Sequence, residues 1–351
     1  MENSIFEYKG FDCDIEQQTS DSFEQFALAQ QEGIAPKKLK APIFGMWEIT
    51  SKCPQNCIYC YNSSPMRVEE LSGRQLFDVA DQIVEARLFS ICLTGGEPTM
   101  RPEYDDLVRY LCVSGINVAT AISGANITQP RAKMLSRYLS TVQISLDGST
   151  AEIHDGVRRR EGSYQDAINA IQWFAAEGVR VKVSFAASTK NIDDLERVYG
   201  LCDELGVSEL RTQKLAISGK VKNHEDGIVP TSEQYDRYMQ FINVHPKLKC
   251  KLVYGDPSVH ITKGVKMDMV LLTRITSEGN VGITPYADIY FGNVNEKRLT
   301  EIFDSMVGAW NKPQVRECII KGLLSTEDET VRDGLSKKIF MLKGSPLSIF
   351  A

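Results

Sequence analysis

The sequence contains no apolar run long enough to span a membrane, and its first residues lack the apolar core of a signal peptide. Positive charge is not in excess, because the 351-residue chain has a net charge of −6. A chain without a broad basic surface releases few phosphate counterions, so nucleic acid is not expected as a partner. The missing export signal also favours free thiols over disulfides. We therefore expect a cytoplasmic protein that binds neither membranes nor nucleic acid.

Most of the nine cysteines are isolated, but three of them lie within eight residues. Cys53, Cys57 and Cys60 have the spacing C-x3-C-x2-C, and no further cysteine pair or nearby histidine completes a structural zinc site. Three thiolates can hold three irons of a 4Fe–4S cluster and leave the fourth iron open to a substrate or cofactor. The spacing therefore predicts an iron–sulfur centre, with chance clustering of the thiols as the alternative.

Short apolar segments alternate with amphipathic ones between residues 41 and 218. The patterns predict strands over 44–50, 89–94, 116–122, 141–146, 180–186 and 207–213, and helices over 72–87, 103–114, 130–139, 163–177 and 192–205. The strands are apolar without alternation, which is typical of a parallel sheet covered on both faces. Six βα units predict an α/β fold, a partial TIM-like (βα)6 barrel with its site at the carboxyl ends of the strands. A flat doubly wound sheet is the alternative.

The pattern changes after residue 218, so we divide the chain into an N-terminal extension (1–40), the barrel (41–218) and a C-terminal extension (219–351). The C-terminal part is predicted to be a small α+β unit. Its expected elements are a helix over 231–243, a β-hairpin formed by 269–275 and 280–291, and a helix over 298–310. Residues 1–40 are polar and irregular, and the last forty residues receive no assignment.

Glycines and polar side chains follow the predicted strands. The second strand ends in Gly95-Gly96-Glu97, where the glycines would let the backbone approach a ligand and the carboxylate could pair with an amine. The third strand leads to Ser123. Each of these segments alone is as compatible with an ordinary βα turn.

The fourth strand is followed by a second group of polar residues. Ser145 and Asp147 lie two positions apart, so they share a face of a regular strand and suit the hydroxyls of a ribose. Further along, Arg158 could hold a carboxylate through two hydrogen bonds. In barrel order, the strand ends would surround the predicted cluster with groups for an amine, a carboxylate and a ribose.

These motifs together resemble those of radical S-adenosylmethionine (SAM) enzymes. The three-cysteine motif with Tyr59 before its last cysteine, GGEP after the second strand and SLDG…HDGVR after the fourth occur in the peptide-modifying branch of that family. The resemblance covers roughly residues 43–215. It implies that the cysteines hold three irons of one 4Fe–4S cluster and that SAM binds the fourth. The implied SAM contacts are Tyr59 to the adenine, Glu97 to the amine, Arg158 to the carboxylate, and Ser145 with Ser123 or Asp147 to the ribose.

The segment from Ile275 to Phe303 is similar to the hairpin and helix of SPASM or twitch extensions, which usually carry auxiliary iron–sulfur clusters. The cysteine expected after Val281 is absent, and the only cysteines after residue 215 are Cys250 and Cys318. Two distant thiols do not fill a four-cysteine site. We therefore expect an extension without auxiliary clusters, in which these two cysteines are buried apolar residues.

The resemblance implies that one electron cleaves SAM to methionine and a 5′-deoxyadenosyl radical, which abstracts hydrogen from a substrate. The substrate we expect is a ribosomally made peptide, changed by epimerisation or by backbone rearrangement or excision. The implied partners are that precursor peptide, a separate leader-peptide recognition protein, and an electron donor such as flavodoxin or ferredoxin. A radical SAM enzyme for a small molecule, such as a sugar nucleotide or cofactor precursor, is the first alternative. A non-catalytic metal-binding scaffold is the second, and no catalytic side chain is assigned beyond the cluster.

Overall fold

The computed structural model describes residues 41–64, 68–216, 218–221, 227–255, 269–285, 289–313 and 315. The expectations for residues 1–40 and for the last forty residues lie outside these ranges, apart from residues 312, 313 and 315. The strands are β1 (Phe44–Thr50), β2 (Ser90–Gly95), β3 (Asn117–Ile122), β4 (Thr141–Ser145), β5 (Arg180–Ala187), β6 (Glu209–Lys214), β7 (Lys251–Tyr254), β8 (Leu272–Ile275), β9 (Asn280–Gly282) and β10 (Tyr290–Asn293). The helices are α2 (Gly73–Glu85), α3 (Tyr104–Val113), α4 (Gln129–Leu135), α5 (Ala151–Arg158), α6 (Ser163–Ala176), α7 (Leu195–Glu204), α8 (Ser232–Val244) and α10 (Leu299–Met306), with 3-10 turns at Pro98–Met100, Ile192–Asp194 and Ala309–Asn311.

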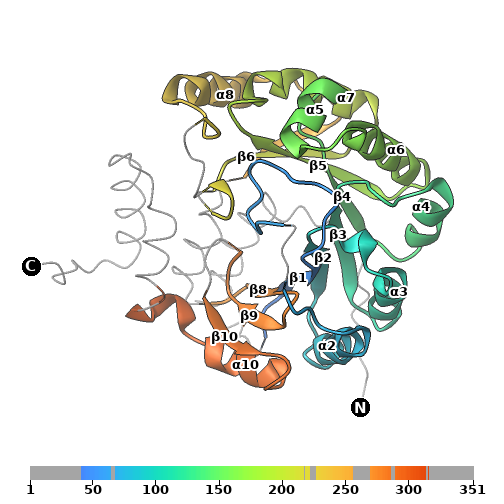
Figure 1. Ribbon diagram of the computed structural model, residues 1–351, viewed down its shortest axis with the longest axis vertical. Coiled ribbons are helices and arrows are strands. Elements are labelled where there is room, and N and C mark those ends of the chain that lie inside the picture. Colours follow the sequence, from blue (N-terminus) through green and yellow to red (C-terminus); the bar gives the residue numbers. More distant parts are fainter. Residues whose placement is uncertain are drawn as a thin grey trace, which may run out of the picture. The chain divides into compact units, whose positions relative to one another are not determined.

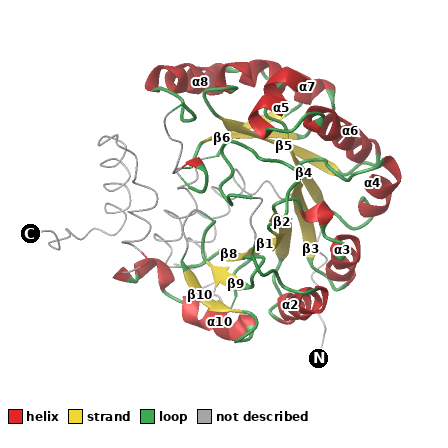
Figure 2. Ribbon diagram, in the orientation of Figure 1, coloured by secondary structure: helices red, strands yellow, loops and turns green. Residues whose placement is uncertain are grey.

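All of these strands belong to one curved sheet with the order β10-β9-β8-β1-β2-β3-β4-β5-β6-β7. Neighbouring strands from β8 through β1 to β7 run parallel, whereas β9 is antiparallel to both β8 and β10. Figure 1 shows helices α2, α3, α4, α6 and α7 along the outer side of this curve, and Figure 2 shows the strands inside it. The predicted partial barrel with a C-terminal α+β extension is therefore confirmed.

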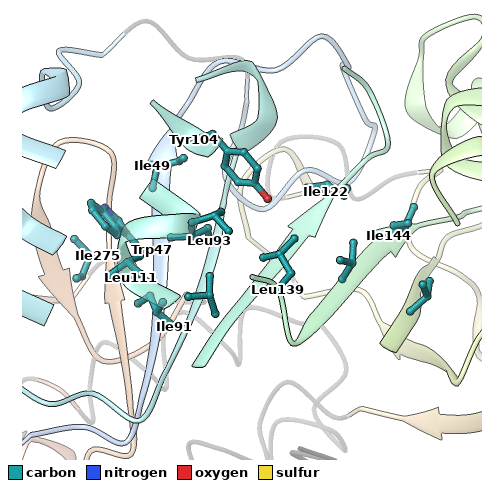
Figure 3. Packing of buried hydrophobic residues seen from close by; sticks show 14 of the residues in the cluster. Trp47, Ile49, Ile91, Leu93, Tyr104, Leu111, Ile122, Leu139, Ile144 and Ile275 are labelled. Atoms are coloured by element: carbon teal, nitrogen blue, oxygen red, sulfur yellow. The ribbon is translucent and has the colours of Figure 1, made fainter. Parts of the chain in front are cut away.

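The core lies between the sheet and its outer helices. Trp47 of β1, with Ile91 and Leu93 of β2, is fully buried in a cluster that includes Leu111 of α3 (Figure 3). Helix α2 begins one residue after its predicted start, because Ser72 caps its first turn in a capping box with Gln75. Apolar side chains on the outer face of the sheet thus hold the helices against it.

Burial alternates along β3 and β4, whereas β1, β2 and β5 have consecutive buried residues, so only β3 and β4 depart from the expectation of a sheet covered on both faces. In β3, Val118, Thr120 and Ile122 are buried while the residues between them are only half-buried. The same alternation occurs in β4. The physical reason is that the outer face packs on helices, whereas the inner face of a partial barrel looks into its interior.

Two elements of the barrel were not predicted from the sequence. Strand β7 adds a seventh parallel strand next to β6, and α5 forms where only a loop containing HDGVR was expected. Helix α5 is capped by Thr150, whose hydroxyl accepts a hydrogen bond from the Ile153 amide, and it ends at Arg159 in the left-handed conformation.

None of the helices in the described ranges is both long and apolar enough to cross a membrane.

The predicted hairpin is formed by β8 and β9, with Gly279 at a φ of 89° in its turn. Strand β8 also pairs in parallel with β1, which joins the C-terminal extension to the barrel sheet. A buried ion pair crosses this junction, because Arg274 of β8 donates to both carboxylate oxygens of Glu48 at 2.9 and 3.0 Å. Tyr61 in the cysteine loop donates to the same carboxylate at 3.2 Å.

Candidate functional site

The cysteine loop leaves the carboxyl end of β1 and is fixed there by Glu70. The Glu70 carboxylate accepts hydrogen bonds from the Thr50 hydroxyl at 3.0 and 3.1 Å and from the Ser51 amide and hydroxyl, both at 2.7 Å. Arg101 donates to the same carboxylate at 2.8 Å. Burial alone would raise the pKa of Glu70, but these contacts together outweigh it and lower the pKa, so Glu70 remains ionised and holds the residues that precede Cys53.

The two glycines after β2 pack against the start of this loop. The Gly96 amide donates to the Thr50 carbonyl at 2.7 Å, and the next amide donates to the Lys52 carbonyl at 2.8 Å. A Cβ added at Gly95 or Gly96 would lie 2.2 Å from one of these carbonyl oxygens. The glycines were predicted to let the backbone approach a ligand; in the structure the close approach is to the backbone of the cysteine loop itself.

The three predicted cluster ligands are free thiols of one loop. Cys57 is buried, while Cys53 and Cys60 are half-buried. Burial raises the pKa of Cys53 to about 12 and also raises that of Cys60, so binding a metal would release protons from these thiols. No three metal-binding side chains in the described part of the chain converge on a single ion. In a cubane 4Fe–4S cluster each thiolate binds a different iron. The three sulfurs therefore do not need to converge on a single point, and these three thiols fit such a cluster.

Glu97 lies fully buried beside the Ser123 segment. One oxygen accepts from the Ser123 amide at 2.7 Å and from its hydroxyl at 2.5 Å, and the other accepts from the Thr99 hydroxyl at 2.6 Å and amide at 3.3 Å. Burial raises the pKa of Glu97. The hydrogen bonds from Ser123 and Thr99 lower it, but burial has the larger effect. The structure therefore brings together the second and third strand ends that the sequence singled out.

Asp147 is the centre of a second buried group. The hydroxyl of Tyr59 donates to its carboxylate at 2.5 Å, and Arg158 Nε lies 2.6 Å from the same oxygen. The guanidinium also lies over the Tyr59 ring and donates to the sulfur of Cys57 at 3.4 Å. Three residues predicted to contact SAM thus contact each other and one cluster ligand. The hydroxyl of Ser145 accepts a hydrogen bond from the Ser184 hydroxyl at 3.4 Å.

His154 in α5 orients this group and was not predicted as a site residue. Its Nδ1 accepts a hydrogen bond from the Asp147 amide at 3.0 Å, which assigns the ring proton to Nε2. The side chain is fully buried, and burial together with the charge of Arg158 lowers its pKa to about 4. The histidine is therefore neutral at physiological pH.

We expect the fold to lose stability on acidification because of His154. A histidine whose folded pKa lies below its unfolded value stabilises the fold above pH 6.5, and that contribution disappears as the pH falls toward 4. Relative to the His154→Gln variant, the wild type should lose about 2 kcal/mol between pH 7.5 and pH 5 in denaturant unfolding. An identical pH dependence of the two proteins would contradict the assigned neutral state.

Several contacts to the loop could not be found from the sequence. Glu70 lies 19 residues from the serine that it binds, and Lys220, more than 150 residues away, donates to Asn56 and to the Ser64 carbonyl. Neither residue belongs to a recognisable motif. The His154 contact is the exception, since its position seven residues after Asp147 in the SLDG…HDGVR stretch was a visible signal.

The arrangement combines a thiol-rich loop with buried acid and base groups at the ends of neighbouring strands. The ionised Glu70 and the hydrogen bonds of Gly96 fix the loop, while Glu97, Asp147 and Arg158 offer charges in a water-poor environment. Such a site suits a cofactor that carries both an amine and a carboxylate beside an iron–sulfur cluster.

Comparison with known sequences agrees with this chemistry. The sequence model of the radical SAM superfamily matches residues 47–202. The mycofactocin maturase MftC of Mycobacterium tuberculosis (strain ATCC 25618 / H37Rv) is 36% identical over 258 residues, covering 72% of this chain and 64% of that protein. MftC of Mycobacterium ulcerans (strain Agy99) is 35% identical over 257 residues, covering 72% and 68%. The chain thus spans about two thirds of the length of these relatives.

A more distant relative and a solved structure extend the comparison. The AdoMet-dependent heme synthase of Methanosarcina barkeri (strain Fusaro / DSM 804) is 25% identical over 292 residues, covering 76% of this chain and 83% of that protein. SuiB of Streptococcus suis bound to SAM has the same fold, with a TM-score of 0.63 at 12% identity over 84% of this chain and 72% of SuiB. SuiB has also been solved bound to its precursor peptide SuiA. From the cysteine loop, the partial barrel and these matches, the chain belongs to the radical SAM superfamily of enzymes.

Proposed function

We propose that the protein cleaves SAM reductively and uses the resulting 5′-deoxyadenosyl radical to abstract hydrogen from a ribosomally synthesised peptide. The observation that carries this proposal is the link between the two halves of the site, because Arg158 contacts both Asp147 and the cluster ligand Cys57. A cofactor that touched the open iron would therefore lie against the predicted SAM-binding residues.

In this proposal Cys53, Cys57 and Cys60 hold the cluster. When bound, a 4Fe–4S cluster supplies the electron that breaks the carbon–sulfur bond of SAM. Glu97 would accept a hydrogen bond from the SAM amine, and Arg158 would neutralise its carboxylate. In the present structure both side chains are already held by protein partners, so SAM would share them or displace one partner. Burial of these charges strengthens their interaction with a bound zwitterion.

The remaining contacts are those that the family resemblance implies. Tyr59 would lie at the adenine, and Ser145 with Ser123 or Asp147 would contact the ribose. Gly95 and Gly96 would take part by fixing the loop, with the backbone contacts described above. A flavodoxin or ferredoxin would deliver the electron, and cytoplasmic location follows from that requirement for a low-potential donor.

The peptide substrate is supported by the relatives. MftC is named as a maturase of mycofactocin, and SuiB binds a precursor peptide. We also propose that the C-terminal extension carries no auxiliary cluster. Cys250 is fully buried beside β7, and Cys318 lies outside the described residues. Epimerisation or backbone rearrangement needs no electron acceptor of that kind, and a separate protein would recognise the leader peptide.

A small-molecule substrate is the second candidate, favoured by the heme synthase of Methanosarcina barkeri, which is matched over more of its own length than MftC is. A precursor peptide is longer than a tetrapyrrole, so it would contact the enzyme outside the barrel as well as inside it. Crosslinking of the enzyme to a photoreactive precursor peptide, competed by the unlabelled peptide but not by a porphyrin, would separate them in favour of the peptide.

Anaerobic reconstitution with iron and sulfide tests the proposal directly. We expect about four irons per chain and formation of 5′-deoxyadenosine when SAM and a strong reductant are added. About eight irons would contradict the absence of an auxiliary cluster. Four irons without any cleavage of SAM, in the presence of the precursor peptide, would instead favour a non-catalytic metal-binding scaffold.

A further inference from the structure

The short segment from Ser218 to Val221, which follows β6, lies across the cysteine loop. The backbone amide of Lys220 donates to the Cys60 carbonyl at 3.0 Å, and the side chain of Val221 is fully buried. Gly219 has a φ of 53°, and a Cβ there would lie 2.3 Å from the carbonyl oxygens of Cys60 and Tyr61. Only glycine allows this close approach of two backbones.

The side chain of Lys220 spans the loop that carries the last two cluster ligands. Its ammonium donates to the side-chain oxygen of Asn56 and to the carbonyl of Ser64, both at 2.6 Å. Asn56 precedes Cys57, and Ser64 follows Cys60. A single ammonium group therefore ties together the two sides of the loop.

The positive charge of Lys220 is not neutralised by these contacts. Both acceptors are uncharged amide oxygens, the side-chain oxygen of Asn56 and the backbone carbonyl of Ser64. The backbone amide of the same residue donates to the Cys60 carbonyl at 3.0 Å, so the residue that carries this charge directly contacts a cluster ligand. The ammonium is thus placed to stabilise negative charge at the cluster position.

We propose that Lys220 is a positioning residue of the iron–sulfur centre, which clasps the cysteine loop and favours the reduced state of the bound cluster. A 4Fe–4S cluster held by thiolates becomes more negative on reduction, so a fixed cation nearby raises its midpoint potential. The proposal is independent of the substrate. It assigns a role to the segment that follows β6, which the sequence motifs did not include.

The test compares Lys220→Met and Lys220→Arg with the wild type, all reconstituted as holoenzymes under anaerobic conditions. The matched control is Lys247→Met, because Lys247 is exposed. We expect Lys220→Met to release iron to a chelator about tenfold faster, the effect of losing hydrogen bonds from a charged group, and to show a lower midpoint potential in a titration followed by electron paramagnetic resonance. Lys220→Arg should keep the wild-type potential, and the control should match the wild type in both measurements.

A wild-type rate of iron release and a wild-type potential in Lys220→Met would overturn the proposal. A lower melting temperature with an unchanged potential would overturn it too, since that result reduces Lys220 to a structural residue. If the methionine variant does not fold, Lys220→Gln keeps a hydrogen-bond donor without the charge. A potential of Lys220→Gln equal to that of the wild type would then refute the electrostatic role, and a lower one would support it.

Discussion

Replacing Gly96 with alanine is expected to destabilise the protein by roughly 3 kcal/mol and to prevent stable assembly of the cluster. The added Cβ would lie 2.2 Å from the Lys52 carbonyl oxygen, and both groups belong to the backbone, so no side-chain rotation relieves the overlap. The strand end and the loop must then separate, which breaks the hydrogen bonds from Gly96 to Thr50 and from Glu97 to Lys52. Denaturant unfolding and iron content per chain are the two measurements.

The control for this variant is Gly200→Ala. Gly200 lies inside α7 with no positive φ, and a Cβ there meets no atom within 4 Å. Alanine has a higher helix propensity than glycine in a helix interior. The Gly200→Ala variant should therefore be as stable as the wild type or up to about 1 kcal/mol more stable. Equal stability and equal iron content of the Gly96 and Gly200 variants would show that the loop does not depend on this backbone contact.

The Arg158→Met variant is expected to lose about 3 kcal/mol of unfolding free energy, because it leaves the carboxylate of Asp147 buried without its cation. Asp147 is fully buried and keeps only neutral donors, the Tyr59 hydroxyl and the Ala186 amide at 3.0 Å. The variant should also bind SAM more weakly, since the proposed partner of the SAM carboxylate is removed. Chemical denaturation and equilibrium binding of SAM measure the two effects separately.

A second substitution distinguishes the causes. The double variant Asp147→Asn/Arg158→Met removes the unpaired charge and should regain most of the lost stability, but not the affinity for SAM. The exposed pair made by Arg237 and Glu233 provides a reference, because Arg237→Met should change stability by only about 0.5 kcal/mol. A double variant as unstable as Arg158→Met alone would mean that the arginine contributes through packing rather than through its charge.

Elements with a strong local pattern were predictable from the sequence. The first strand was expected over residues 44–50 and occupies those residues, and α2 begins one residue after its predicted start because Ser72 caps it. The fold class followed from the alternation of such elements. The contacts among Tyr59, Asp147 and Arg158 agree with the expectation that the carboxyl ends of parallel strands meet at one edge of the barrel, and the binding of SAM by these residues stays a prediction.

Contacts between distant parts of the chain were not predictable. Strand β7 has only four residues, of which three are apolar, so its sequence is too short to indicate a strand and its pairing with β6 was not predicted. The ion pair between Arg274 and Glu48 joins residues separated by 226 positions. Glu70 and Lys220 also hold the cysteine loop through long-range contacts of a charged side chain. In the sequence, both look like ordinary charged surface residues.

The parallel pairing of β8 with β1 limits how this protein can be cut or recombined. A chain truncated before β8 would turn β1 into an open edge that invites aggregation, and it would strand the carboxylate of Glu48 in the interior without Arg274. Grafting the C-terminal extension of a relative onto this barrel therefore requires a strand with an arginine at the position of Arg274. The C-terminal extension is therefore part of the barrel sheet rather than an interchangeable module.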